Sequence, residues 1–220
     1  MKAPVIVVGI GEMGSVFARA LLRSGHPVYP VTRHGDLAAT AQRLPSPELV
    51  LVAVAENDLH AVLQQMPAAW HARLALLQNE LLPGDWQQYG YTNPTVISVW
   101  FEKKKSQDIK VLIPYPMIDH STEMLQKSLT SLDIPARTLA SEDELLFELV
   151  VKNVYIVTTH CAGLVTGGTV SELWADHREL AEAVAREVIQ IQESLTGQQF
   201  QADELIAAMV KTAKEHQATV

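Results

Sequence analysis

The chain of 220 residues has one cysteine, Cys161, and charged residues make up only 19% of it. A single cysteine excludes a framework of internal disulfides and is typical of a protein in the reducing cytosol. His160 precedes Cys161, but neighbouring residues of a helix point about 100° apart. We therefore expect Cys161 to be a small, buried apolar side chain and not a nucleophile.

Basic residues are scarce, because 17 Lys and Arg stand against 25 Asp and Glu. Nucleic-acid phosphates need a concentrated basic face, so this balance argues against nucleic acid as a partner. The one basic run, Lys103-Lys104-Lys105, is typical of a solvated turn between two strands. His71, His120 and His177 are scattered without the spacing of metal ligands, so we predict no metal site.

No Asp, Glu, Lys or Arg occurs in residues 153–171. The Thr, His and Gly residues of this stretch make it a poor membrane span, so we expect a buried helix and no membrane partner. The chain also opens without a charged and then apolar leader. These features favour a cytoplasmic protein.

Short apolar runs alternate with helical patterns along the first 140 residues. We expect strands at residues 4–8, 26–31, 49–54, 73–77, 95–101, 109–113 and 136–139, and helices at 13–24, 38–44, 57–66 and 121–132. The proline-containing stretch at residues 113–116 is interpreted as the exit from the sheet. The alternation predicts the α/β class, with a doubly wound, mostly parallel Rossmann sheet.

Beyond residue 140 the pattern is helical, so we expect a small all-helical domain at residues 141–220 after a Rossmann domain at residues 1–140. An acidic start at residues 141–144 opens a long helix that runs to about residue 165. A capping box from Thr169 to Glu172 opens the next helix, which Gly197 stops, and a terminal helix covers residues 203–214.

The carboxy-terminal helices carry more apolar surface than so small a domain can cover. One stripe consists of Leu173, Leu180, Val184, Val188, Ile191 and Leu195. We expect a homodimer through these helices, because twofold dimers are the commonest oligomers. The alternative is a monomer in which the terminal helix folds back to complete the core.

A glycine-rich loop lies between the first strand and the first helix, in a βαβ unit of about 30 residues. Its residues are Gly9, Ile10, Gly11, Glu12, Met13 and Gly14. In this context the pattern G-x-G-x-x-G predicts a dinucleotide site. Gly9 permits a tight turn, Gly11 lets the backbone approach the pyrophosphate, and Gly14 lets helix and strand pack closely. The alternative is a glycine-rich turn without a ligand.

The end of the second strand bears on the choice of cofactor. NAD enzymes place an acid there to hold the ribose hydroxyls, but this chain has no acid before Asp36. Arg33 can instead pair with a 2′-phosphate while Thr32 donates a hydroxyl, which favours NADP. The alternative is a surface ion pair of Arg33 with Asp36. Pro30 removes an amide from a strand expected to be central, so we predict a bulge or an early strand end there.

With this loop, Arg33 and the pair Gln78-Asn79, the first half of the chain resembles the ketopantoate reductase family, and residues 148–164 resemble it more loosely. The resemblance implies a Rossmann domain, a helical second domain and NADP-dependent reduction of a 2-keto acid. It implies that Asn79 reaches the nicotinamide and the substrate, and that Ala53 and Val54 lie against the cofactor. It also implies that Lys152 is the general acid, and Asn153, which follows it directly, is a further catalytic candidate.

The sequence departs from the family at several positions. Glu80 stands where the family's Gln-Asn-Gly triplet has glycine, and Val54 stands where the family has a lysine. Lys152 and Asn153 are adjacent, whereas the family spaces its lysine and asparagine one helical turn apart. The chain is also shorter and has no counterpart of the late Ser and Glu residues that bind the family's substrate.

Two roles fit Lys152: donating a proton to the alkoxide that hydride transfer forms, or pairing with Glu148 one turn back. His160 is expected to be a satisfied core or interface histidine. The leading hypothesis is an NADP-dependent reductase of a small carbonyl compound. The alternatives are a non-catalytic NADP-binding or sensing protein and a deazaflavin-dependent NADP reductase.

Overall fold

The computed structural model describes residues 2–102, 110–111, 115–118 and 122–218. The chain forms two compact units. The sheet unit comprises Met1–Leu81 and Asp85–Leu145, and the helical unit comprises Leu82–Gly84 and Leu146–Val220. The predicted turn at Lys103-Lys104-Lys105 and the side chain of His120 lie outside the described residues.

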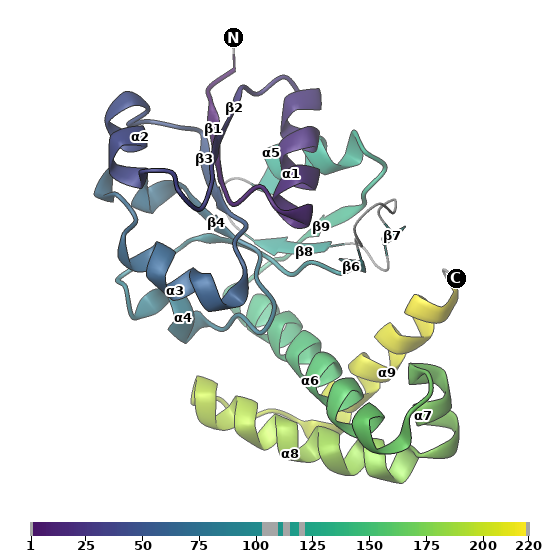
Figure 1. The fold of residues 1–220 in the computed structure, drawn as a ribbon. Helices are drawn as coiled ribbons and strands as arrows, with labels where there is room; N and C mark the ends of the chain where they lie inside the picture. Colours follow the sequence, from purple (N-terminus) through teal and green to yellow (C-terminus); the bar gives the residue numbers. More distant parts are fainter. Residues whose placement is uncertain (1, 103–109, 112–114, 119–121, 219–220) are drawn as a thin grey trace. The chain divides into compact units, whose positions relative to one another are not determined.

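A seven-stranded sheet forms the sheet unit, in the order β2-β1-β3-β4-β5-β8-β9 (Figure 1). Its strands are β1 (Val5–Val8), β2 (Val28–Val31), β3 (Leu49–Val52), β4 (Leu74–Leu76), β5 (Thr95–Ile97), β8 (Tyr115–Ile118) and β9 (Ala136–Thr138). The pairings from β2 to β5 are parallel, and only the pairing of β5 with β8 is antiparallel. The expectation of a doubly wound, mostly parallel Rossmann sheet is confirmed.

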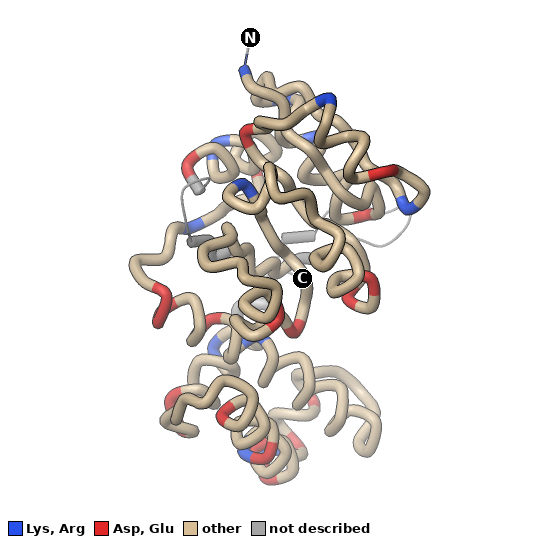
Figure 2. Tube along the Cα trace, turned by 90° about the vertical axis from the view of Figure 1, so that its left-hand side faces the viewer, with Lys and Arg blue, Asp and Glu red and all other residues tan. Residues whose placement is uncertain are grey.

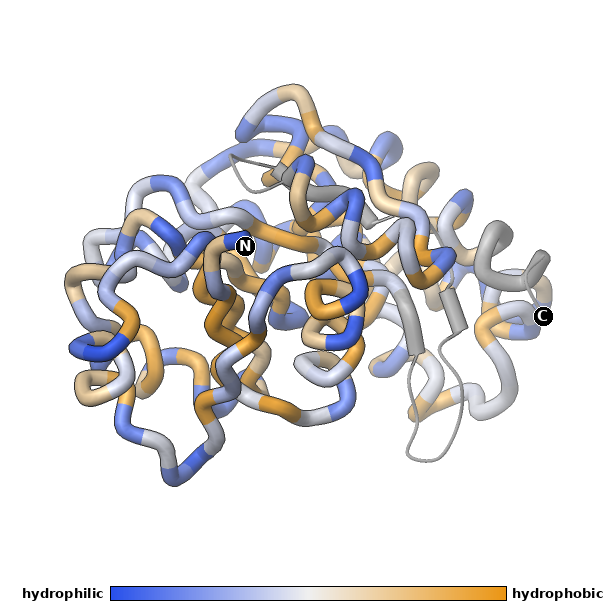
Figure 3. Tube along the Cα trace, turned by 90° about the horizontal axis from the view of Figure 1, so that it is seen from above, coloured by the Kyte–Doolittle hydropathy of each residue, from blue (hydrophilic) through white to orange (hydrophobic). Residues whose placement is uncertain are grey.

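Helices lie between the strands of the sheet unit. They are α1 (Glu12–Arg23), α2 (Leu37–Arg43), α3 (Glu56–Gln64), the 3-10 helix η1 (Ala68–Arg73), α4 (Pro83–Gln87) and α5 (Thr122–Thr130). Burial of apolar side chains drives this arrangement: every residue of β1 and β3 is buried, together with Phe17 and Leu21 of α1. Apolar segments run through the interior of this unit, and hydrophilic segments follow its turns (Figure 3).

Two strand predictions are wrong. The described part of residues 109–113 forms β7 (Lys110–Val111), which pairs with β6 (Phe101–Glu102) in a separate two-stranded sheet. Tyr115 and Pro116, the described part of the stretch interpreted as the exit from the sheet, belong to β8. Only Met117 and Ile118 pair with β5, so Pro116, which lacks an N–H, stands outside that ladder. A proline is tolerated at such a place, and its presence did not mark the end of the sheet.

The described chain after residue 141 forms four helices: α6 (Glu142–Thr166), α7 (Val170–Asp176), α8 (Arg178–Thr196) and α9 (Ala202–Ala218). The predicted capping box is confirmed, because the Thr169 hydroxyl accepts from the Glu172 N–H and the Glu172 carboxylate accepts from the Thr169 N–H. Gly197 ends α8 in the left-handed conformation, at φ +69°. The predicted single helix up to Gly197 is two helices, which meet at His177.

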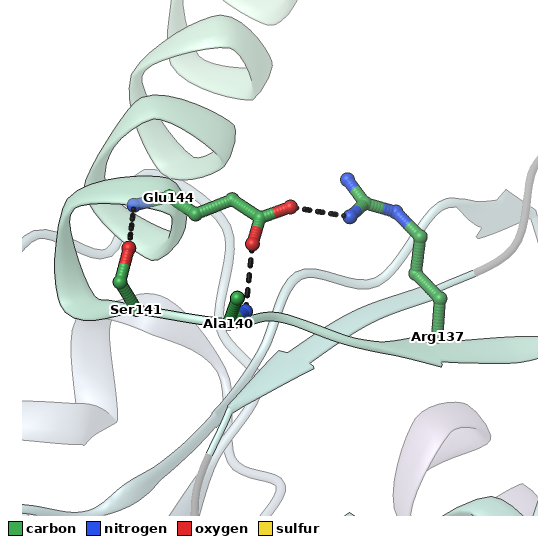
Figure 4. A network of polar contacts seen from close by, with 4 residues as sticks. All are labelled: Arg137, Ala140, Ser141 and Glu144. Atoms are coloured by element: carbon green, nitrogen blue, oxygen red, sulfur yellow. Dashed lines mark hydrogen bonds and ion pairs between the residues drawn. The ribbon is translucent and has the colours of Figure 1, made fainter.

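The start of α6 is held by a network of four residues (Figure 4). Ser141 Oγ accepts from the Glu144 N–H at 3.1 Å, and the Glu144 carboxylate accepts from the Ala140 N–H at 2.7 Å and from Arg137 at 3.0 Å. The hydrogen bond from Ala140, followed by the one from Arg137, lowers the pKa of Glu144. The predicted acidic start of this helix therefore acts as a cap.

Within the described residues, α6 is the one helix long and apolar enough to cross a membrane by length and composition, and 56% of its most apolar window is buried. Cys161 is exposed, so the prediction of a buried thiol is wrong. The reason is helical geometry: Ala162 packs in a buried cluster with Leu173 and Ala181, and the preceding residue points about 100° away from it.

Charged residues are scattered along the described chain, with Lys and Arg interspersed among Asp and Glu (Figure 2). The described residues contain no group of three or more His, Cys, Asp or Glu that could hold a metal ion.

Candidate functional site

The strand order brings four predicted segments to one edge of the sheet. The glycine loop follows β1, Thr32 and Arg33 follow β2, Ala53 and Val54 follow β3, and Asn79 follows β4. All four strands are parallel, so their carboxyl ends meet at this edge. The order β2-β1-β3 makes the gap between β1 and β3 the topological switch point, where sheets of this kind bind their ligands.

The three glycines of the loop differ in how much space each would leave for a side chain. Gly9 has φ +92°, and a Cβ there would lie 2.6 Å from the carbonyl oxygen of Ala53. A Cβ on Gly14 would lie 1.9 Å from the carbonyl oxygen of Gly9. A Cβ on Gly11 would meet no atom within 4 Å. Packing therefore explains Gly9 and Gly14, whereas the space beside Gly11 is left open by the chain.

The amino end of α1 opens beside that space. The N-cap residue is Gly11, which has no side chain to cap the helix, and Ser15 makes the first bond of the helix, to the Gly11 carbonyl. The preceding N–H groups have no partner inside the helix and carry the positive end of its dipole. This arrangement suits a phosphate group. Ile10 is 41% exposed and Met13 is partly buried beside the same space.

Beyond β2, Thr32 and Arg33 are exposed. The Arg33 guanidinium donates to the Asp58 carboxylate at 3.2 Å, and Asp36 caps α2 by accepting from the Ala39 N–H at 3.0 Å. The proposed pair of Arg33 with Asp36 is therefore wrong. The sequence held no signal for Asp58, because the strand order decides which helix faces Arg33.

The prediction of a bulge or early strand end at Pro30 is wrong. Strand β2 pairs in regular parallel register from Val28 to Val31, with Pro30 opposite Val7. Strand β2 is the first in the strand order and so forms an edge of the sheet, where Pro30 is exposed. An edge strand needs hydrogen bonds on one side only, which is why proline is accommodated there.

Gln78 joins the ends of β3 and β4, a role that the sequence did not reveal. Its side chain is 5% exposed. The amide nitrogen donates to the Val52 carbonyl at 2.8 Å and to the Val54 carbonyl at 3.4 Å, while its oxygen accepts from the Leu77 N–H at 3.1 Å. Gln78 thus fixes the segment with Ala53 and Val54 relative to Asn79, whose own side chain is exposed.

Glu80 has φ +54°, in the left-handed region that favours glycine. This is the residue that replaces the glycine of the family's Gln-Asn-Gly triplet. The turn after β4 therefore keeps the backbone conformation that a glycine would allow, at a cost to a residue with a side chain.

The remaining candidates lie on α6 in the helical unit. Lys152 is 3% exposed and Asn153 is 2% exposed. The Asn153 amide donates to the Gln192 amide oxygen of α8 at 3.1 Å, which ties the two helices together. Since neighbours on a helix point about 100° apart, Lys152 cannot share this contact direction. His160 is exposed, so it is not a core histidine.

The strands and helices described above define a Rossmann-type fold with a helical second unit. No protein-family model matches the sequence, and no curated protein matches it. Solved structures do share the fold. A dimeric ketopantoate reductase from Staphylococcus aureus is 14% identical, with a TM-score of 0.66, and the match covers 96% of this chain and 86% of that one.

Two other solved structures are similar to the same extent. A 2-dehydropantoate 2-reductase from Methylococcus capsulatus is 15% identical, with a TM-score of 0.62 over 95% of this chain and 79% of that one. A D-mandelate dehydrogenase in complex with NADH is 12% identical, with a TM-score of 0.62 over 99% of this chain and 79% of that one. The chain therefore has the fold that the resemblance to the ketopantoate reductases implied.

Replacing Glu80 with glycine should raise the free energy of unfolding by about 0.5–1 kcal/mol. Glycine removes the strain of the left-handed backbone in the folded state. This gain exceeds the loss of stability that comes from the greater conformational entropy of glycine in the unfolded chain. Asp133, at φ +58°, provides the matched control, and Asp133→Gly should give a similar gain. Chemical denaturation measures both. A loss of stability in Glu80→Gly alone would mean that the Glu80 side chain makes a contact worth more than the backbone strain.

Proposed function

We propose that the protein binds a nicotinamide dinucleotide at the carboxyl edge of the sheet and reduces a small carbonyl compound of the 2-keto acid type. The observation that carries this proposal is the loop at the switch point, where packing requires Gly9 and Gly14 but leaves the space beside Gly11 open. The adjoining helix end supplies N–H groups for a pyrophosphate. Solved structures of the same fold include ketopantoate reductases and a dehydrogenase bound to NADH.

We propose NADP(H) as the preferred cofactor. Arg33 is exposed at the end of β2, where the ribose of a dinucleotide lies in Rossmann proteins, and Thr32 is exposed beside it. A guanidinium recognises a phosphate with two parallel hydrogen bonds. Asp36, the acid that follows, is engaged as the cap of α2. This assignment and the exposed Cys161 fit a protein of the cytoplasm.

In this proposal the residues of the chain orient the substrate and manage one proton. A bound dinucleotide would supply the hydride. The exposed amide of Asn79 would hold the carbonyl group, with its position fixed through Gln78. Lys152 would donate a proton to the carbonyl oxygen as negative charge develops there. Asn153 is engaged with Gln192, and we assign it the role of positioning α6.

Replacing Arg33 with alanine should weaken NADPH binding by about 1.5–3 kcal/mol, the usual value of a hydrogen bond to a charged group. NADH lacks the 2′-phosphate, so its affinity should barely change. Isothermal titration with both cofactors measures the difference, and Arg43→Ala, which removes an exposed arginine from α2, is the control. Equal losses for both cofactors would show that Arg33 does not recognise the phosphate.

Replacing Lys152 with alanine should lower kcat for small 2-keto acids by about 100-fold or more, the usual contribution of a general acid. NADPH oxidation measures turnover, and Lys127→Ala, which removes an exposed lysine, is the control. Unchanged turnover in Lys152→Ala would remove this lysine from the mechanism. Tight NADPH binding without turnover of any carbonyl in the wild-type protein would support the non-catalytic, cofactor-sensing alternative.

We also propose that the protein is a homodimer through its carboxy-terminal helices. Leu164 and Val165 at the end of α6 are 88% and 77% exposed, and Ile191 and Leu195 of α8 are 54% and 64% exposed. The other members of the predicted stripe on α7 and α8 are buried or partly buried. Exposed apolar side chains on two neighbouring helices are typical of a protein interface.

Light scattering should give about twice the 24.2 kDa mass of the chain at micromolar concentration. Leu164→Glu should shift the protein toward the monomer, because it places a charge in the proposed interface. Leu22→Glu is the matched control, since Leu22 is 57% exposed but lies in the sheet unit. A monomeric mass for the wild-type protein would exclude the dimer.

A further inference from the structure

The ion pair of Arg33 with Asp58 joins segments that follow the two neighbours of strand β1. Arg33 lies two residues after β2, and Asp58 lies in the first turn of α3, the helix that follows β3. Strand β1 stands between β2 and β3, and the glycine loop leaves its end. The pair therefore joins the two sides of the edge at which a dinucleotide would bind.

Asp58 pairs with the guanidinium of Arg33, the group that would bind a 2′-phosphate. One terminal nitrogen of the Arg33 guanidinium donates to Asp58 at 3.2 Å. The two side chains are 80% and 47% exposed, so an incoming ligand can reach both. An exposed pair of this kind is weak, and a phosphate dianion can displace it. This displacement costs free energy, however, because the Asp58 carboxylate loses its partner Arg33 and then lies close to the negatively charged phosphate.

We propose that Asp58 is a specificity-determining residue that competes with the 2′-phosphate for Arg33 and so weakens the preference of the site for NADP(H) over NAD(H). The inference rests on the proposed binding of a dinucleotide at this edge. Repulsion between the carboxylate and the phosphate acts in the same direction as the competition. A dinucleotide without the 2′-phosphate is exposed to neither effect.

Glu56 provides a matched control for charge. It lies in the same first turn of α3 as Asp58 and is exposed. Within the described part of the chain, Arg33 pairs with Asp58 and not with Glu56. Asp58→Asn and Glu56→Gln therefore remove the same charge from the same helical turn, but only the first releases Arg33.

The experiment measures the Kd of NADPH and of NADH for the wild-type protein and for these two variants at low ionic strength. Asp58→Asn should bind NADPH about two- to fivefold more tightly, the range that an exposed ion pair allows. NADH should change less than twofold in both variants, and Glu56→Gln should leave NADPH within twofold. At 1 M salt the gain in Asp58→Asn should disappear, because charges are screened over about 3 Å.

The Arg33→Ala background separates competition from repulsion. In the Arg33→Ala variant, the additional Asp58→Asn change should lower log Kd for NADPH by less than half of the decrease that the same change causes when Arg33 is present. A full gain in that background would overturn the proposed action through Arg33, and so would weaker NADPH binding in Asp58→Asn, which would mean that Asp58 orients Arg33. Failure of the wild-type protein to bind either cofactor would instead refute the proposed function.

Discussion

The close contact of Gly9, Gly14 and Ala53 is the constraint on which the candidate site depends. A Cβ on Gly14 would lie 1.9 Å from the Gly9 carbonyl oxygen, and a Cβ on Gly9 would lie 2.6 Å from that of Ala53. Only glycine lets α1 begin this close to β1 while β1 stays paired with β3. The same contact places the amino end of α1, the positive end of its dipole, at the edge where the parallel strands end.

The polar groups of the sheet unit follow from this geometry. The interior strands β1 and β3 are wholly apolar and buried, so polar side chains enter at the carboxyl ends of the strands. Gln78 is a buried polar residue at this edge, and its amide makes three hydrogen bonds with the backbone there. In the turn that follows β4, Glu80 has a strained, left-handed backbone conformation. A buried amide and a left-handed residue thus follow each other closely at the end of β4, and backbone strain of this kind is common at binding sites.

Local sequence patterns predicted the strands and helix ends that depend on neighbouring residues. They did not predict the features that depend on contacts between distant segments. Continuous apolar runs predicted β1 and β3, and the capping box at Thr169 predicted the start of α7. The edge position of β2, the partner of Arg33 and the role of Gln78 depend on the strand order, which no single segment encodes. Cys161 was misjudged for a related reason, since the face that a helix buries depends on its neighbours.

Helical geometry separates two residues that the sequence placed together. Lys152 and Asn153 are both almost fully buried in an apolar helix, where a polar group needs a partner. Asn153 donates to Gln192 of α8, so the side of α6 that bears Asn153 faces α8. Adjacent residues point about 100° apart, so Lys152 leaves the helix in a different direction from Asn153.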